Sequence, residues 1–123
     1  DVAEFREQLY GIWPAAMEQG RLAGQNMAGT AARYTGSVMA NTLKVVGIDL
    51  ASAGEIDPEG RYESKVYANR EQYTKLVLGA DQEVVGAILL GDTKPFRKIT
   101  KTMQAGEKAE ALLSELFTDA CQT

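Results

Sequence analysis

Short connections between consecutive β-rich segments limit the possible folds of this chain more than any other feature of the sequence. The segments span residues 62–69, 73–80 and 83–91, and they are joined around residues 70–72 and 80–82. Parallel neighbours would need a crossover of a dozen or more residues, whereas antiparallel neighbours need only a hairpin turn. The spacing therefore predicts three consecutive antiparallel strands.

A further β-rich segment, residues 42–50 with the sequence TLKVVGIDL, precedes these three. It is followed by ASAGEIDPEG, in which Pro58 and Gly60 mark a turn. We therefore expect an antiparallel sheet of about four strands, which lies within the usual range of sheet sizes.

A helical pattern over residues 14–29 stands before the sheet. Pro14 suits the first helical position, where its missing N–H costs nothing, and Gly29 suits the end. Very small residues recur every four positions and share one side of this helix. They are Ala16, Gly20, Gly24 and Ala28. This strip predicts that the helix lies close against a sheet or another piece of backbone.

Two helices close the chain. Asp92 or Thr93 can cap the first of them, Pro95 lies just inside it, and Gly106 ends it. The second carries the apolar stripe of a helix that packs on a core. This stripe comprises Ala109, Leu112, Leu113, Leu116 and Phe117. Because strands come first and helices follow without alternation, the sequence predicts an α+β fold with both C-terminal helices on one sheet face.

The composition argues against several classes of function. A net charge of -4 and a pI of about 4.8 argue against nucleic acid as a partner. No apolar run reaches the roughly 20 residues of a membrane span and no signal peptide opens the chain, so we expect a cytoplasmic protein with no membrane partner. Histidine is absent and Cys121 is the only cysteine, which excludes His-based triads and CxxC chemistry. No residue is predicted to be catalytic or to bind a metal.

Other patterns have ordinary structural explanations. Neither GxGxxG nor GxxxxGK[ST] occurs, so the known phosphate-binding loops are absent. The carboxylate pairs Asp81/Glu83 and Glu55/Asp57 lie in predicted turns, where acidic residues make local hydrogen bonds. The basic residues on the helix after Pro95 share it with apolar ones, and we interpret them as its solvated face. These basic residues are Arg97, Lys98 and Lys101.

The start of the first helix has no capping residue beside its proline. The sequence there is Trp13-Pro14-Ala15-Ala16, although the first turn of a helix leaves backbone N–H groups without partners. A helix N-terminus with small residues can accept a ligand oxygen or an electron-rich ring. Trp13 is either a buried anchor of the helix or one wall of a ligand site, and the sequence leaves both open.

Two stretches carry a resemblance to a known family. DVAE at residues 1–4, followed by WPAAMEQGR at 13–21, resembles the end of the FAD domain in the pyridine nucleotide-disulfide oxidoreductase superfamily. The similarity is to the branch of NADH:rubredoxin reductases and the NADH-binding part of nitrite reductases. LKVVGIDLASAGEI at 43–56 resembles the first strand of the C-terminal domain of that branch.

The resemblance implies a set of cofactor-binding residues. In the family, the Asp of a Gly-Asp pair binds the ribityl chain of FAD, and the next helix points its N-terminus at the flavin N1/O2 edge. Asp1 matches that Asp, and Trp13, Pro14 and Ala15 match the helix start. A positive helix end there would stabilise the reduced flavin and raise its potential. FAD is expected in a full-length parent and not in this chain alone.

The resemblance also implies a division of the chain. Residues 1–32 would be the end of the FAD-binding domain, and residues 33–123 a C-terminal interface or dimerisation-like domain. The implied partners are the parent's own FAD- and NAD-binding domains, a second subunit, and an electron acceptor such as rubredoxin. The parent would be an NAD(P)H oxidoreductase, and the chain alone would be inactive. The alternative is a protein-interaction module without flavin, in which Trp13 belongs to the core.

Overall fold

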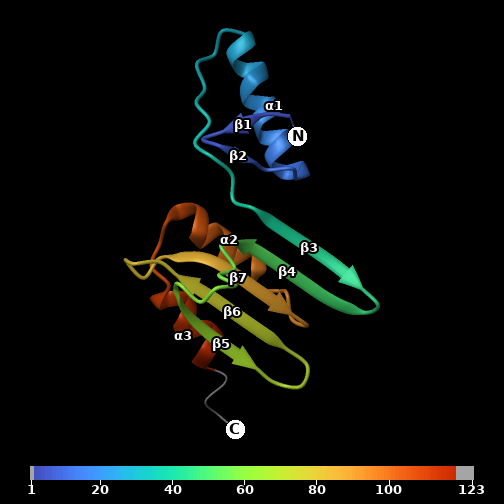
Figure 1. Cartoon of the computed structure of the whole chain (residues 1–123), viewed down its shortest axis with the longest axis vertical. Helices are drawn as coiled ribbons and strands as arrows, with labels where there is room; N and C mark the ends of the chain where they lie inside the picture. Colours follow the sequence, from blue (N-terminus) through green and yellow to red (C-terminus); the bar gives the residue numbers. More distant parts are fainter. Residues whose placement is uncertain (1, 119–123) are drawn as a thin grey trace. The chain divides into compact units, whose positions relative to one another are not determined.

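The computed structural model describes residues 2–118, so Asp1 and Cys121 lie outside the described residues. The chain forms two compact units that divide between Met39 and Ala40 (Figure 1). The first unit holds one helix and a small hairpin, and the second holds a sheet and two helices. The predicted domain boundary at residue 32 concerns the domains of a parent protein and stays a prediction.

The first unit begins with a hairpin that the sequence did not predict. Strand β1 (Glu4–Phe5) pairs with β2 (Gln8–Leu9), and the turn residues Arg6 and Glu7 have φ angles of 50° and 65°. Positive φ at both central residues is typical of the tightest hairpin turns. Helix α1 follows over Trp13–Met27, close to the predicted range of 14–29.

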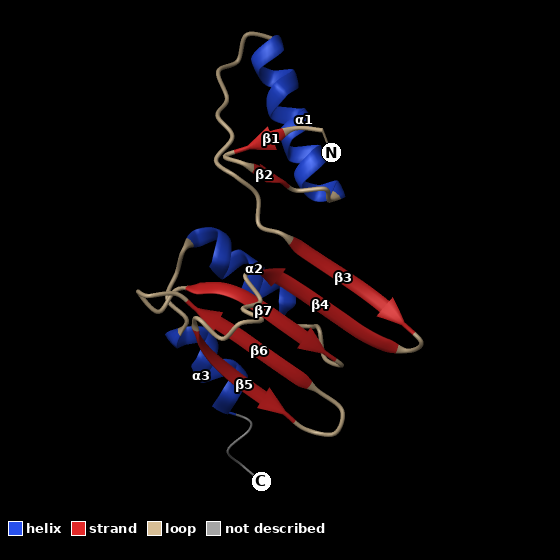
Figure 2. Cartoon of the chain, viewed as in Figure 1, coloured by secondary structure: helices blue, strands red, loops and turns tan. Residues whose placement is uncertain are grey.

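The second unit is built on a five-stranded antiparallel sheet. Its strands stand in the order β3-β4-β7-β6-β5, and Figure 2 shows them side by side. They are β3 (Ala40–Val45), β4 (Ile48–Gly54), β5 (Glu63–Ala68), β6 (Tyr73–Leu78) and β7 (Val84–Leu90). The three consecutive antiparallel strands expected from the short connections are confirmed as β5, β6 and β7.

The sheet has one strand more than the predicted number because the segment 42–50 is a hairpin and not one strand. Val46 and Gly47 form its turn with φ angles of 50° and 80°, and Val45 pairs with Ile48 across it. Strand β4 then pairs with β7, so β3 and β4 extend the sheet on the side opposite β5. The predicted α+β class is confirmed.

Helices α2 (Phe96–Ala105) and α3 (Glu110–Thr118) cover one face of this sheet (Figure 2). Buried residues from the strands and both helices form a single core there. It comprises Ala51, Leu76, Leu78, Val84, Ala87, Leu89, Ile99, Ala109 and Leu112. Pro95 is the N-cap of α2 and has no side-chain hydrogen bond, so neither Asp92 nor Thr93 caps the helix. Gly106 ends it as predicted, with a φ of 64° that favours glycine.

A loop crosses the opposite face of the sheet. It runs from Gly54 to β5 and appears in green in Figure 1. The backbone N–H of Glu55 donates to the carbonyl of Val85 at 2.9 Å, and a Cβ at Gly86 would lie only 1.6 Å from the carbonyl oxygen of Glu55. Glycine is therefore required at residue 86 for the loop to lie directly on the sheet.

Candidate functional site

The start of α1 has no side-chain cap. Ile12 is the N-cap residue, in an extended conformation with φ −126° and ψ 145°, and its carbonyl accepts the N–H of Ala16 at 3.1 Å. Within residues 2–118, no side chain bonds to the first turn, and that turn contains no acidic residue. Since the first N–H groups of a helix have no intrahelical acceptor, this end of α1 has the local chemistry of a site for an oxygen-bearing ligand.

The residues predicted at this helix start differ in their accessibility. Trp13 is 77% exposed and Pro14 is also exposed, whereas Ala15 has no exposed surface. A ligand at the helix end would therefore contact Trp13 and Pro14, but not Ala15 in this conformation. Trp13 is not a core residue of its own unit, contrary to one of the two interpretations left open by the sequence. The cofactor-binding role of these residues stays a prediction, and Asp1 lies outside the described residues.

A network of tyrosines and Ser37 holds the segment after α1 against the helix. The backbone N–H of Ser37 donates to the hydroxyl of buried Tyr10 at 3.2 Å, and the Ser37 hydroxyl donates to the carboxylate of Glu18 at 2.5 Å. Tyr34 shares a hydrogen bond of 2.7 Å with Ser37 and packs edge-on against Phe5, at 4.8 Å between ring centroids. This network connects the hairpin, the helix and residues 34–37, so it fixes the chain that leads into Trp13.

The strip of small residues on α1 remains open. The described part of the chain places nothing within 4 Å of a Cβ built at Gly20 or Gly24. The close packing predicted for this strip is therefore not provided by the described residues of its own unit. Neighbouring apolar side chains on the helix are also exposed, at Met17 and Met27.

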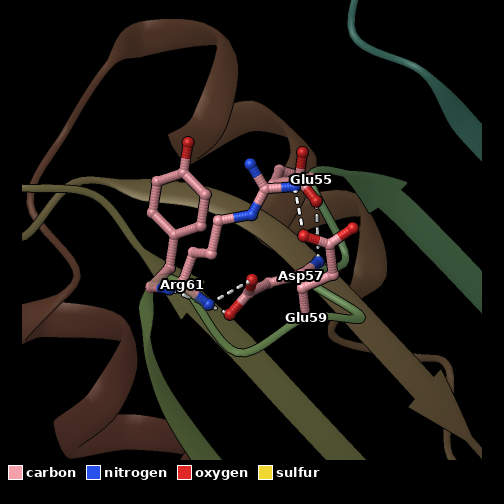
Figure 3. Close-up of polar contacts among 5 residues, drawn as sticks. Glu55, Asp57, Glu59 and Arg61 are labelled. Carbon is pink, nitrogen blue, oxygen red and sulfur yellow. Dashed lines mark hydrogen bonds and ion pairs between the residues drawn. The ribbon is translucent and has the colours of Figure 1, made fainter.

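The loop on the sheet contains a buried acidic residue, Asp57, whose contacts are drawn in Figure 3. Its carboxylate accepts the backbone N–H groups of Arg61 at 2.7 Å and of Tyr62 at 3.0 Å. Burial raises the pKa of Asp57, but these two hydrogen bonds and the positive charges of Lys75 and Arg61 outweigh it, so the pKa lies below its ordinary value. Asp57 is therefore ionised at neutral pH and folds the loop on itself.

Both carboxylate pairs that stood out in the sequence make the local hydrogen bonds expected of turns. The Glu55 carboxylate accepts the N–H of Asp57 at 2.7 Å, and that of Glu83 accepts the N–H of Asp81 at 2.9 Å. Residues 2–118 contain no group of three or more side chains able to hold a metal ion. Nor does any helix in that range have the length and apolarity to cross a membrane.

An apolar row crosses the sheet on the face opposite α2 and α3. Strand pairing places Leu43 opposite Leu50, Leu50 opposite Leu90, and Leu90 opposite Tyr73. Leu43 is 54% exposed, and Leu90 is exposed as well. The sequence alone does not reveal this row, because it depends on the pairing of β4 with β7, two strands far apart in the chain. We call these four residues the apolar row.

Comparison with known proteins gives one matching family model. Residues 40–107 match the model described as Rubredoxin NAD+ reductase C-terminal domain. This range begins at the first residue of the second unit and ends just after α2. It therefore covers the whole sheet and the first of the two helices that pack on it.

Similar sequences occur in bacterial reductases. The chain is 31% identical over 105 residues to the assimilatory nitrate reductase electron transfer subunit of Bacillus subtilis. This alignment covers 84% of this chain and 14% of the relative. It is 30% identical over 115 residues to the NADH-rubredoxin oxidoreductase of Clostridium acetobutylicum, covering 93% of this chain and 30% of the relative. The chain thus spans less than a third of the length of either relative.

Solved structures agree with these sequence matches. The crystal structure of NADH:rubredoxin oxidoreductase from C. acetobutylicum superposes with a TM-score of 0.67 and 27% identity, over 94% of this chain and 32% of that one. A NAD-dependent persulfide reductase from A. fulgidus has a TM-score of 0.66 at 23% identity and shares the fold. The resemblance inferred from residues 1–21 and 43–56 is confirmed: the chain belongs to the Rubredoxin NAD+ reductase C-terminal domain family.

Proposed function

We propose that this chain is the C-terminal part of a cytoplasmic flavoprotein that passes electrons from NAD(P)H through FAD to a protein or small-molecule acceptor. Residues 1–32 would complete the FAD-binding domain, and residues 33–123 would form the interface domain. Relatives of this chain are NADH-dependent or NAD(P)H-dependent oxidoreductases by name, and the chain matches only a part of each. On its own it would carry no redox activity.

The uncapped start of α1 is the observation that carries this proposal. The exposed ring of Trp13 stands beside exposed Pro14, at a helix end with no capping side chain and no acid in its first turn. An acidic or hydroxyl cap would compete for the same N–H donors that an anionic flavin edge requires. These two residues fit FAD at this end, whereas buried Ala15 would have to contribute through a different local conformation.

Bound FAD would supply the hydride-accepting ring system, and the described residues would bind and orient it. The indole of Trp13 would shield one side of the site from water, and the partial positive charge of α1 would favour electron density at the flavin edge. No described side chain would need to transfer a proton. The alternative without flavin requires Trp13 to be a core residue, and its 77% exposure counts against that.

The second unit would contact the remainder of the parent or a second subunit. A sheet face with a continuous row of exposed and half-buried leucines and a tyrosine is unusual for a surface that faces only water. The apolar row has these properties on the face away from α2 and α3. Burial of this row against another domain would hold the unit close to the flavin.

The visible absorption spectrum of the full-length parent, before and after anaerobic addition of NADH, tests this function. A flavin spectrum that bleaches is the expected result. A parent that is colourless and does not bind added FAD would reject the proposal in favour of the interaction module.

A pair of variants in the same parent tests the site. Trp13→Ala should lower the FAD content after purification, and Tyr62→Ala should not, although both rings are exposed in this chain. Tyr62 lies on the loop before β5 in the second unit and is not part of the proposed site. Equal FAD content in the two variants would remove Trp13 from the proposed site while leaving the flavoprotein proposal intact.

A further inference from the structure

Four basic residues lie at the start and on the outer side of α2: Lys94 just before the helix, and Arg97, Lys98 and Lys101 on it. The spacing of the last three places them along one side of the helix, and all four residues are exposed. We call this set the basic stripe. It holds four of the 13 basic residues of a chain whose net charge is -4, and residues 93–106 contain no acidic residue.

The basic stripe opposes the stability of its own helix. Like charges three and four residues apart repel one another, and cations near a helix N-terminus are unfavourable because that end already carries partial positive charge. Arg97 and Lys98 lie in the first turn of α2, which has no acidic residue. A surface selected only for solubility would alternate charges, so the stripe has a cost that a binding role would offset.

Most of this positive charge is not neutralised within the described residues. Lys98 pairs with Glu115 of α3, and that pair is about half exposed on each side. Within residues 2–118, Lys94, Arg97 and Lys101 form no ion pair. One guanidinium group and two ammonium groups are therefore available to interact with a partner.

The stripe stands on a rigid support. Ile99 on the other side of α2 is fully buried in the core and Thr102 is nearly so, while Phe96 and Met103 pack against the same core. A firmly packed helix fixes the backbone positions from which its outer side chains extend, so the helix itself needs no ordering when a partner binds.

From these observations we infer that the basic stripe is a docking surface for a protein partner with an acidic surface. Charge complementarity favours protein over nucleic acid, because an overall negative chain is repelled by a long polyanion, while a compact acidic patch can meet the stripe alone. This inference does not depend on the proposed flavin site.

Titration of the chain with a fluorescently labelled peptide of about 12 glutamates tests the inference by anisotropy and by amide NMR shifts. We expect binding at low salt that weakens as salt rises, with the largest shifts at residues 94–101. Absence of binding at low salt, or shifts centred elsewhere, would overturn the proposal. Tighter binding of duplex DNA at equal charge would overturn it in favour of a nucleic-acid partner.

Matched charge reversals separate the stripe from net charge. One double variant combines Arg97→Glu with Lys101→Glu, and the control combines Lys44→Glu with Arg70→Glu. Each double variant changes the net charge from -4 to -8, because each reversal lowers the charge by two. The first pair should weaken peptide binding at least tenfold and the second less than about threefold, by long-range screening alone. Equal losses would refute a specific surface. If the first pair does not fold, Arg97→Gln with Lys101→Gln should still weaken binding about threefold or more.

Discussion

Replacement of Gly86 by alanine should strongly destabilise the second unit, because the loop over the sheet leaves no room for a side chain. A Cβ there would lie 1.6 Å from the carbonyl oxygen of Glu55, 2.5 Å from its carbonyl carbon and 3.0 Å from its nitrogen. These are backbone atoms, so no rotamer change relieves the clash. The loop would have to move off the sheet.

Movement of the loop breaks identifiable interactions. The bond from Glu55 N–H to the carbonyl of Val85 would be lost, and the Lys75 ammonium donates to the carbonyls of Ile56 at 2.9 Å and Asp57 at 3.1 Å. Overpacking of a buried position costs about 1–3 kcal/mol, and the loss of one net hydrogen bond adds about 1 kcal/mol. We therefore expect the Gly86→Ala variant to lose about 2–4 kcal/mol of unfolding free energy.

Urea unfolding of the full chain, followed by far-UV circular dichroism, measures this change as a shift of the midpoint at constant m. Trp13 is the only tryptophan and lies in the first unit, so its fluorescence reports separately on that unit and should not change.

Gly79→Ala is the matched control for this measurement. Gly79 is also buried in the second unit, but its Cβ would meet only the carboxyl end of Glu83, which can rotate away. A loss below about 1 kcal/mol is expected, since at most the hydrogen bond from Asp81 N–H would be given up. Equal losses for the two alanine variants would refute the argument that the loop lies directly on the sheet.

Three further perturbations test other parts of the structure. The pKa of Asp57 is lowered in the folded chain below the ordinary 3.8. Its ionised form therefore contributes stability that is complete above pH 3.8 and is lost as pH falls through the folded pKa. Between about pH 5 and pH 3, the urea midpoint should fall less for Asp57→Asn than for the wild type. Val46→Asn should raise the unfolding free energy by about 1 kcal/mol, because Asn tolerates the φ of 50° at this turn better than a β-branched residue; an unchanged midpoint would contradict that turn geometry. Acrylamide should quench Trp13 emission in the isolated chain nearly as well as in a short peptide, given its 77% exposure, and strong protection would show that Trp13 is buried.

The predictions that succeeded rest on local information. Three strands with short connections can only form an antiparallel meander, and the apolar spacing of α3 requires a core on one side. Gly106 ended α2 as expected because a left-handed C-cap favours glycine. Each of these features is decided within about ten residues of sequence.

The two hairpins that were missed lack the usual residue at the first central position of their turns. Val46-Gly47 and Arg6-Glu7 both form turns with positive φ at each central residue, a geometry usually marked by Asn or Gly at the first position. Valine, by contrast, is a strong β-former, so the pattern over 42–50 predicted an unbroken strand. The hairpin is imposed by pairing of β4 with β7, which overrides the local preference of Val46.

The site at α1 shows a different limit of sequence reasoning. The absence of a capping residue before Pro14 was evident in the sequence, and the structure has no side-chain cap there. Accessibility was not evident: Trp13 is exposed and Ala15 is buried although they lie two residues apart, because exposure depends on which side of the helix faces the rest of its unit. The role of these residues toward FAD stays a prediction.

The second unit presents two unlike surfaces on opposite sides of its sheet. Pairing puts the side chains of Leu43, Leu50, Leu90 and Tyr73 on the face away from the helices, whereas the basic stripe lies on the outer side of α2. A partner on one side therefore leaves the other side accessible, because the sheet and the core separate them. If the apolar row packs against the rest of a reductase, an acidic protein can dock on α2 at the same time. Charge reversal of Arg97 and Lys101 should then abolish that docking without changing FAD content in the full-length parent, and a loss of both would show that the two surfaces are coupled.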